Sequence, residues 1–285
     1  MSSRESRTII YGRSNKPVIR FRFKAVPIFF IIPIIVCFII YMAGVNIGIG
    51  SGKSKKINKI QSLIADSQIE SSVDEMPVSK NNDIVNPVPE SDPVSETYLG
   101  KCMFVGDSIT VGFADYQFVS MKNICATVGM NIEKINTDKM KTTYGELTAL
   151  DTLKEAKPAN IYIMLGSNGI AWMTNEEMLS LYSDFVDNIK KALPDSDVYI
   201  LSIPPVTAER EASKKDPIKN EAIDQYNSEL LKMADSKGIY YVDINTVLKG
   251  SDGKFPAADA ADDGMHFKKN TYKTVVDYIL SHTAA

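Results

Sequence analysis

The chain has 285 residues, of which 44% are hydrophobic and 24% charged, and its formal net charge is -3. That length allows one sizeable globular domain plus additional segments. The composition is close to the globular average, which excludes collagen, coiled coils and wholesale disorder. Three cysteines and two histidines are too few for a disulfide-stapled scaffold or a histidine-rich metal site.

The first 50 residues predict a membrane anchor. Residues 1–24 hold seven basic side chains and one acidic one, and residues 25–50 hold no charged residue. About 20 apolar residues are needed to cross the hydrocarbon core, so 25–49 predict a single transmembrane helix after a basic tail. The basic excess places that tail in the cytoplasm and the rest of the chain outside the cell, attached to the cell membrane. A cleaved signal peptide is the alternative, but its apolar run would be shorter and would end in a small-residue cleavage site.

Residues 50–97 have the composition of a linker. They contain several prolines, serines and charged residues but no aromatic residue, which predicts a flexible, disordered tether. A helical continuation through part of 55–72 is an open alternative. The tether leads to a single globular domain, predicted to span 98–285.

The globular part alternates short apolar runs with longer amphipathic ones, which predicts an α/β sheet with helices on both faces. Five buried parallel strands are predicted, at Lys101–Val105, Asn123–Val128, Asn160–Leu165, Asp197–Ile203 and Ile239–Ile244. Helices are predicted from Asn175 to about Leu193, from near Pro217 to Gly238, and from Thr271 to Ser281.

Polar or glycine-rich segments stand at the ends of these strands, where open α/β sheets bind ligands. They are Gly106-Asp107-Ser108, then Gly129, then Gly166-Ser167-Asn168-Gly169, and finally Asp263 to Phe267 before the last helix. If the strands are parallel, all four segments lie on the same rim of the sheet.

These residue types suit acyl transfer. A serine hydroxyl such as that of Ser108 becomes a nucleophile when an imidazole takes its proton, and a carboxylate that fixes the imidazole tautomer improves that base. Asp263 and His266 are three residues apart on one short segment, so both side chains can face the same way. The N–H groups of Ser108 and Gly129 and the side-chain amide of Asn168 are candidate oxyanion donors.

The four segments resemble the signature blocks of the SGNH hydrolases, also called GDSL-like lipases and acylhydrolases, in the same order from Lys101 to Leu280. The resemblance implies a three-layer α/β/α sandwich with a flavodoxin-like five-stranded sheet. It implies Ser108 as nucleophile, a triad with Asp263 and His266, and oxyanion donors at Ser108, Gly129 and Asn168. Motif support is implied at Gly106, Asp107 and Gly166. Many members have aspartate after the asparagine, and Gly169 stands there in this chain.

Some candidate residues have plain alternatives. Ser108 alone would suit a helix cap and Asn168 a turn. Asp262 competes with Asp263 for the triad position, and spacing favours Asp263. Trp172 is a candidate pocket residue for an acyl group or a sugar, with half-buried packing equally open.

Two cysteines, Cys102 and Cys125, lie in strands that would be neighbours if the first two predicted strands pair. Buried core thiols are favoured over a disulfide there, because a disulfide needs specific Cβ geometry.

The sequence therefore predicts a membrane-anchored serine esterase, or acyltransferase, that cleaves short acyl esters on cell-envelope glycans, O-acetyl esters first. A lipolytic acylhydrolase and a catalytically silent module that binds a glycan or a partner protein are the alternatives. Residues 61–285 hold 21 basic and 34 acidic side chains, which disfavours nucleic acid as a partner. Metal sites and cofactors are not predicted, because no ligand cluster has zinc or calcium spacing.

Overall fold

The computed structural model of the protein describes residues 84–214 and 218–284. The predicted cytoplasmic tail (1–24), the predicted membrane helix (25–49) and the predicted linker as far as residue 83 lie outside the described residues. In the described ranges, no helix combines the length and the apolar character that crossing a bilayer requires.

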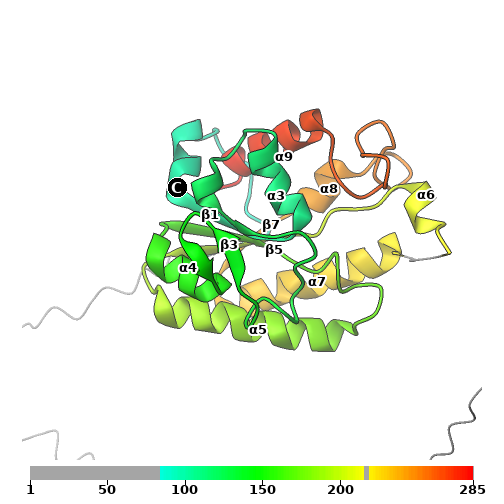
Figure 1. Cartoon of the computed structure of the whole chain (residues 1–285). Helices are drawn as coiled ribbons and strands as arrows, with labels where there is room; N and C mark the ends of the chain where they lie inside the picture. The colour runs from blue at the N-terminus through cyan, green and yellow to red at the C-terminus, as the bar shows by residue number, and fades with distance from the viewer. Residues whose placement is uncertain (1–83, 215–217, 285) are drawn as a thin grey trace, which may run out of the picture. The chain divides into compact units, whose positions relative to one another are not determined.

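A five-stranded sheet forms the centre of the domain (Figure 1). Its strands are β1 (Cys102–Gly106), β2 (Ile124–Ala126), β5 (Asn160–Met164), β6 (Asp197–Leu201) and β7 (Tyr240–Val242). All neighbouring pairs are parallel, and the spatial order is β2-β1-β5-β6-β7. This is the flavodoxin-like order, with the first strand between the second and the third. The predicted α/β class and parallel five-stranded sheet are confirmed for this domain.

Helices cover both faces of the sheet because successive strand residues point to opposite sides. In β1, Met103 and Val105 belong to one apolar core, whereas Cys102 and Phe104 belong to the other. The first core packs against α4 (Ala149–Ala156), α5 (Asn175–Ala192) and α7 (Asn220–Lys237). The second packs against α3 (Ser108–Asp115), α8 (Ile244–Leu248) and α9 (Lys269–Ser281). Figure 1 shows these two helical layers below and above the sheet.

An aromatic row crosses the second face of the sheet. Phe104, Tyr162, Tyr199 and Tyr240 are opposite one another on four adjacent strands. Their rings stack in succession, with centroid separations of 5.2, 4.5 and 4.6 Å. The row fixes the register of β1, β5, β6 and β7, because a slip by one residue would turn each ring to the other face.

The ends of the long helices follow local sequence signals. Thr174 caps α5 in a reciprocal capping box with Glu177, and Gly238 ends α7 in a left-handed conformation with φ of 58°. The three predicted helices are confirmed, with boundaries that differ by a few residues. A hairpin of β3 (Met140–Thr142) and β4 (Gly145–Leu147) was not predicted; it contacts β2, the edge strand of the sheet.

Cys102 and Cys125 are both buried free thiols. Although β1 and β2 are neighbours, Cys102 belongs to the core of one face and Cys125 to the core of the other. The prediction of core thiols is confirmed, and the sheet itself separates the two sulfur atoms.

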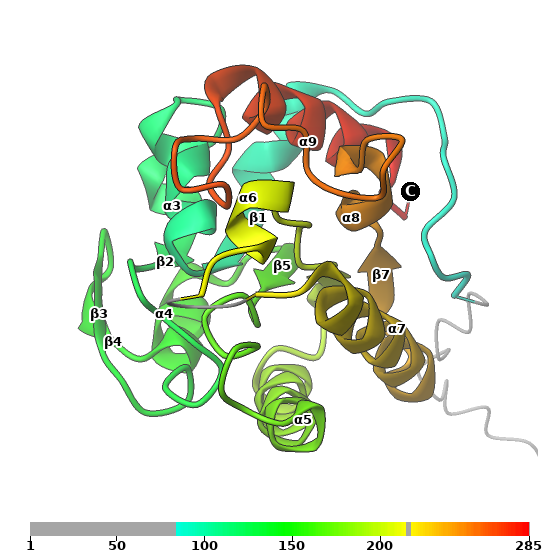
Figure 2. The ribbon, with the colours of Figure 1, turned by 90° about the vertical axis from the view of Figure 1, so that its right-hand side faces the viewer.

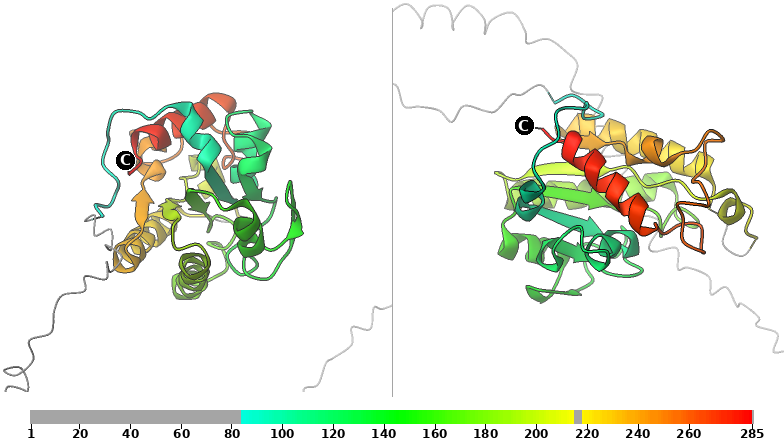
Figure 3. Two further views of the ribbon diagram at one scale, coloured as in Figure 1. Left: turned by 90° about the vertical axis from the view of Figure 1, so that its left-hand side faces the viewer. Right: turned by 90° about the horizontal axis from the view of Figure 1, so that it is seen from above.

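The last part of the predicted linker is folded onto the domain. Residues 84–95, here called the N-terminal strap, run from β7 to the end of α9 (Figures 2 and 3, in cyan). The Asn86 side chain bonds to the carbonyl of Ile239 and to the N–H of Tyr241, at 2.9 and 2.7 Å. The N–H of Val94 donates to the carbonyl of Leu280 at 2.9 Å. The predicted boundary at 97/98 is therefore too late, because linker-like composition does not prevent backbone bonding to a sheet edge.

Candidate active site

The rim at the carboxyl end of β1 is tightly packed around Gly106. A Cβ at this position would lie 2.0 Å from Thr110 Oγ1 and 2.7 Å from the carbonyl oxygen of Met164. Strand β5 and the first turn of α3 therefore approach β1 so closely that only glycine fits. This packing sets the position at which Asp107 and Ser108 leave the strand.

Asp107 is the N-cap of α3, and Ser108 is the first helical residue. Asp107 Oδ1 accepts the N–H of Ile109 at 2.9 Å, so the cap is Asp107 and the alternative that Ser108 serves as the cap is wrong. Burial raises the pKa of the Asp107 carboxyl to about 6, against the opposing effects of the Ile109 N–H and the nearby His266. The Ser108 side chain is thereby left at the rim.

His266 connects Ser108 to Asp263. Its Nε2 lies 2.8 Å from Ser108 Oγ, and its Nδ1 is hydrogen-bonded to Asp263 Oδ2. The structure thus brings Ser108 into contact with His266, which is 158 positions later in the sequence, and His266 into contact with Asp263 of the same loop. The three groups follow one another in the order nucleophile, imidazole, carboxylate. The competitor Asp262 has no part in this chain of contacts, because the bond to His266 is made by Asp263.

The loop that carries Asp263 and His266 is held from within. Asp263 Oδ1 accepts the N–H groups of Met265 and His266, both at 3.0 Å. Partial burial of the Asp263 carboxyl acts to raise its pKa, but the bonds from the His266 ring and from these two N–H groups lower it below its ordinary value. Asp263 is consequently a carboxylate whose charge faces the imidazole.

Gly264 closes this loop against the segment after β6. Its φ is +72°, a conformation that favours glycine, and an added Cβ would lie 2.3 Å from Thr207 Oγ1. The Gly264 carbonyl accepts the N–H of Thr207 at 3.0 Å. Thr207 is the N-cap of the short helix α6 (Ala208–Glu211), which therefore supports the loop bearing the imidazole.

Asn168 lies beside Asp107 on the loop that follows β5. Its Nδ2 donates to the carbonyl of Met130 at 2.9 Å and to Asp107 Oδ2 at 3.3 Å. Both N–H bonds of the amide thus have protein acceptors, and an additional acceptor would have to share one of them. The first bond ties the Asn168 loop to the turn after β2.

That turn contains Gly129, with φ of +77°. Space for a Cβ exists at this position, since no heavy atom lies within 4 Å of it, so the backbone angle rather than crowding favours glycine. Gly129 immediately precedes Met130, whose carbonyl accepts the Asn168 amide. The predicted oxyanion residues are therefore on connected loops of one rim.

The loop after β5 is built around two glycines. Gly166 has φ of +142°, and a Cβ there would lie 2.5 Å from the Tyr226 ring. Gly169, where many SGNH hydrolases have aspartate, donates its N–H to the Gly166 carbonyl at 2.8 Å and lies close to the sulfur of Met178. At Gly169 an added Cβ would lie 2.9 Å from Met178 Sδ, so a larger residue there requires this flexible side chain to shift.

Trp172 stands on the outside of the same loop. Its indole N–H donates to the Asn168 carbonyl at 2.9 Å, and 58% of the residue is exposed. The half-buried alternative is wrong: the ring is fixed at its polar edge and its surface faces solvent.

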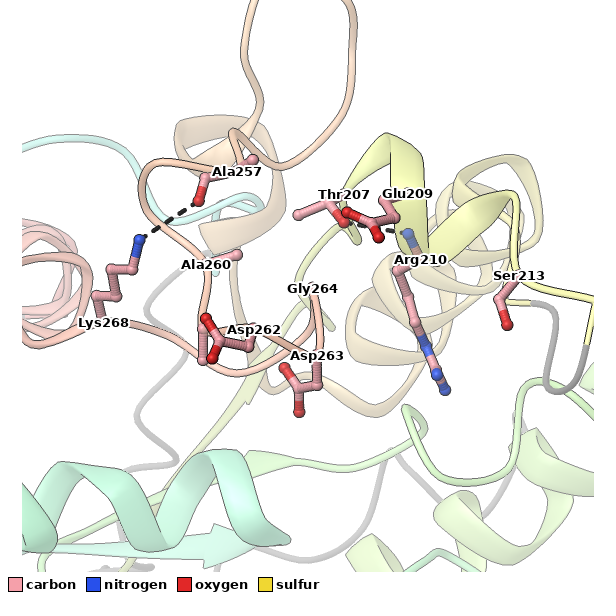
Figure 4. Close-up of a pocket in the computed structure, with 11 residues that line it drawn as sticks. Thr207, Glu209, Arg210, Ser213, Ala257, Ala260, Asp262, Asp263, Gly264 and Lys268 are labelled. Atoms are coloured by element: carbon pink, nitrogen blue, oxygen red, sulfur yellow. Dashed lines mark hydrogen bonds between the residues drawn. The ribbon is translucent and has the colours of Figure 1, made fainter.

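A polar pocket of about 380 Å³ opens beside Asp263 (Figure 4). Its walls include Thr207, Glu209 and Arg210 from the region of α6, and Lys268 after the imidazole. In Figure 4, the side chains of Arg210 and Asp263 point to the same side of the pocket. The sequence reading missed the α6 residues, although they too follow a strand of the sheet, because a helix of four residues leaves no periodic signal.

Asp107 gives a testable electrostatic prediction. Its folded pKa of about 6 exceeds the ordinary value of 3.8, so the folded state binds this proton more tightly and stability falls as pH rises through this interval. Asp107→Asn keeps a carbonyl acceptor for Ile109 and removes the titration. We expect the free energy of unfolding of the variant, relative to wild type, to increase by about 2 kcal/mol between pH 4.5 and 7.5. Chemical denaturation at both pH values checks this, and parallel pH profiles for the two proteins would contradict it.

Residues 104–274 match the sequence model of the GDSL-like Lipase/Acylhydrolase family. No curated protein sequence matches the chain. Among solved structures, a protein from Streptococcus pneumonia, provisionally named a platelet activating factor, has a TM-score of 0.51 at 18% identity, over 64% of this chain and 87% of that one. At that identity the likeness shows the fold alone.

Two further solved structures have lower scores. A GDSL-like lipase from Bacteroides thetaiotaomicron has a TM-score of 0.47 at 17% identity, covering 66% of this chain and 89% of that one. A family 3 carbohydrate esterase from Clostridium thermocellum has a TM-score of 0.48 at 16% identity, covering 64% and 94%.

Proposed function

This chain belongs to the GDSL-like lipase/acylhydrolase family and is a serine ester hydrolase, and we propose that it cleaves its ester with Ser108 as the nucleophile. The observation that carries the proposal is the continuous contact from Ser108 Oγ to His266 Nε2, and from His266 Nδ1 to Asp263. In this arrangement the carboxylate holds the imidazole in the tautomer with its proton on Nδ1, which leaves Nε2 free to take the proton of the serine hydroxyl. A silent binding module would not require these three groups in contact.

The reaction proceeds in two halves. Ser108 Oγ bonds to the ester carbonyl carbon as its proton passes to His266 Nε2, and Asp263 stabilises the resulting imidazolium. Collapse of the tetrahedral intermediate breaks the bond to the alcohol oxygen, which takes the proton from Nε2 and leaves an acyl-Ser108 ester. Water, activated by the same imidazole, then releases the acid. A second hydroxyl compound in place of water would make the reaction an acyl transfer.

The oxyanion is stabilised by N–H donors at the same rim. The N–H of Ser108 belongs to the first turn of α3 and has no intrahelical acceptor, and Gly129 offers a second backbone N–H. The Asn168 amide is the third donor. The bond that the amide donates to Asp107 Oδ2 is the longer of its two, at 3.3 Å. We therefore expect the oxyanion to share the amide hydrogen that points to Asp107 rather than the one donated to the Met130 carbonyl.

The proposed substrate is a short acyl ester of a cell-envelope glycan, with O-acetyl as the first to test. The leaving alcohol has to lie at His266 Nε2 to receive its proton, and the polar pocket is walled by the same loop, through Asp263, whose carboxylate bonds to the other ring nitrogen. Charged and hydroxyl-bearing walls suit a polyhydroxylated alcohol. The exposed Trp172 ring, fixed through its N–H, offers a flat apolar surface against which a sugar ring can pack.

We expect the full-length chain, reconstituted into lipid nanodiscs, to release acetate from an O-acetylated envelope glycan and none from the same glycan de-O-acetylated with mild base. Trp172→Ala is expected to lower the glycan rate relative to the p-nitrophenyl acetate rate by about two- to tenfold, the size of one aromatic contact. Tyr144→Ala, which removes an exposed tyrosine from the hairpin, is the matched control. Turnover of p-nitrophenyl acetate without acetate release from the glycan would show that the proposed glycan substrate is wrong. The esterase activity of the domain would still stand.

The predicted membrane helix at 25–49 is part of this proposal, since it would hold the domain at the outer face of the membrane, where an envelope glycan lies. The same substrate is therefore tested in cells. Deleting the chain should raise the acetyl content of the envelope glycan, and wild type but not Ser108→Ala should reverse the change. An unchanged acetyl content would reject this location and substrate together.

A further inference from the structure

The segment that follows β6 has few backbone donors. Residues 203–207, here called the proline segment, include two consecutive prolines, which have no N–H group. The N–H groups that remain are those of Ile203, Val206 and Thr207. Each of these three donates to an acceptor outside the sheet, so these bonds decide where the segment lies.

Two buried asparagines of α7 hold the first two of these residues. The Asn227 amide accepts the N–H of Ile203 and donates to its carbonyl, both at 2.9 Å. The Asn220 amide makes the same two bonds to Val206, at 2.9 and 3.0 Å. The asparagines are separated by about two helical turns, or about 10.5 Å, and three residues of extended proline-rich chain cover about 9 Å. Both pairs of bonds therefore form in one register.

The last residue of the proline segment is bonded to the loop of His266. Thr207, which directly follows Val206, donates its N–H to the Gly264 carbonyl at 3.0 Å. Among the residues that the structure describes, this is the only backbone hydrogen bond between residues 256–268 and a part of the chain other than α9. Gly264 comes shortly before His266 in the sequence, so the position of Thr207 limits where the imidazole can lie.

The two ends of the proline segment are not held equally. The residue before it, Ser202, donates its N–H to β7 at 3.1 Å, and a side chain of α8 gives a second bond to the Ile203 carbonyl at 3.0 Å. Val206 comes after both prolines, and without Asn220 it would keep one bond, at 3.2 Å, from the N–H of Phe255. Loss of Asn220 would therefore release the end of the segment that is next to the imidazole loop.

We propose that Asn220 is a positioning residue of the reaction. By fixing Val206, it keeps the loop of His266 at the distance at which Nε2 meets Ser108 Oγ. Asn220 is 6% exposed, so it acts through this loop and not on the substrate. The inference rests on the proposed function, in which His266 takes the serine proton. Misplacing a reacting group by about 1 Å can cost about a hundredfold in rate, so we expect the effect in kcat.

The first test compares two asparagine variants of the full-length protein in nanodiscs. Asn220→Leu removes both amide bonds at a similar side-chain size, and Asn227→Leu makes the same change at an equally buried position of the same helix. We expect Asn220→Leu to lower kcat on p-nitrophenyl acetate about ten- to a hundredfold and to leave KM within about twofold. Asn227→Leu should cost less than about threefold in kcat, although it lowers the melting temperature by a similar amount. Equal losses of kcat would overturn the proposal.

A second pair of variants tests the link to the imidazole loop without changing α7. Thr207 has φ of −66°, the angle that proline adopts, so Thr207→Pro removes the N–H that bonds to Gly264. Thr207→Ala keeps this N–H, and both variants lose the hydroxyl that caps α6. We expect Thr207→Pro to lose about as much kcat as Asn220→Leu, and Thr207→Ala to stay within about threefold of wild type. Equal kcat in the two Thr207 variants would contradict the proposal even if Asn220→Leu did not fold.

Two further readouts distinguish a displaced imidazole from an unfolded loop. The chain has two histidines, so its imidazole NMR signals are few, and His266→Gln assigns them. In Asn220→Leu the Nδ1 proton that His266 shares with Asp263 should keep its signal, while a fluorophosphonate should label Ser108 at least about tenfold more slowly. Loss of the proton signal, or unchanged labelling, would overturn positioning. Wild type that neither hydrolyses the ester nor reacts with the fluorophosphonate would instead overturn the proposed function.

Discussion

Replacing Ser108 with alanine is expected to lower kcat on p-nitrophenyl acetate by at least about a thousandfold, to the level of residual catalysis by the oxyanion donors. The reason is the 2.8 Å contact between Ser108 Oγ and His266 Nε2, which pairs the hydroxyl with a base at the rim. Initial rates with purified wild type and variant at matched concentration measure the loss.

The serine variant has two informative companions. His266→Gln should lose as much, and the double variant should lose little more, because residues that act in one step are not additive. Ser228→Ala is the control, since it makes the same change at an exposed serine of α7 and should keep the wild-type activity. Residual activity of Ser108→Ala above a few per cent would show that the acyl group is not carried by this residue.

Asp263→Asn is expected to reduce kcat by about a hundred- to ten-thousandfold while leaving the fold intact. An asparagine amide at this site can donate to His266 Nδ1, which favours the tautomer with its proton on Nε2. That tautomer cannot accept the proton of Ser108. Thermal unfolding of the variant, recorded beside its kinetics, shows whether activity is lost because His266 has the wrong tautomer or because the protein has unfolded.

Asp259→Asn supplies the matched control for the carboxylate. Asp259 is an exposed acid of the same loop, four residues before Asp263, so the substitution removes the same charge without touching the imidazole. We expect it to cost less than about threefold in kcat. Equal losses in the two variants would mean that Asp263 acts through general loop charge rather than through its bond to His266.

The sheet could be predicted from the sequence because buried parallel strands are continuous apolar runs. The predicted strand ends lie within two residues of those in the structure, as with the strand predicted at Ile239–Ile244 and found at Tyr240–Val242. The β3–β4 hairpin could not be predicted, because its two strands have three residues each and mostly face solvent. Strands that short carry no alternation to recognise.

The candidate site was predictable as a set of residues but not as a set of contacts. The strand-end rule placed Ser108, Asn168 and His266 on one rim, and three-residue spacing favoured Asp263. The two acceptors of the Asn168 amide, Met130 and Asp107, depend on how separate loops meet in space. Such pairings are long-range, and no local pattern encodes them.

The N-terminal strap has a mechanical consequence. Its bonds are made at the start of β7 and at the end of α9, the helix that begins just after His266 and runs away from the rim. Tension applied to the chain ahead of residue 84 therefore loads the bonds of Asn86 first, and those of Ser91 and Val94 only after it peels away. The loops that hold Ser108 and His266 carry none of the strap's bonds, so such tension would be borne by the strap before it reached the catalytic rim.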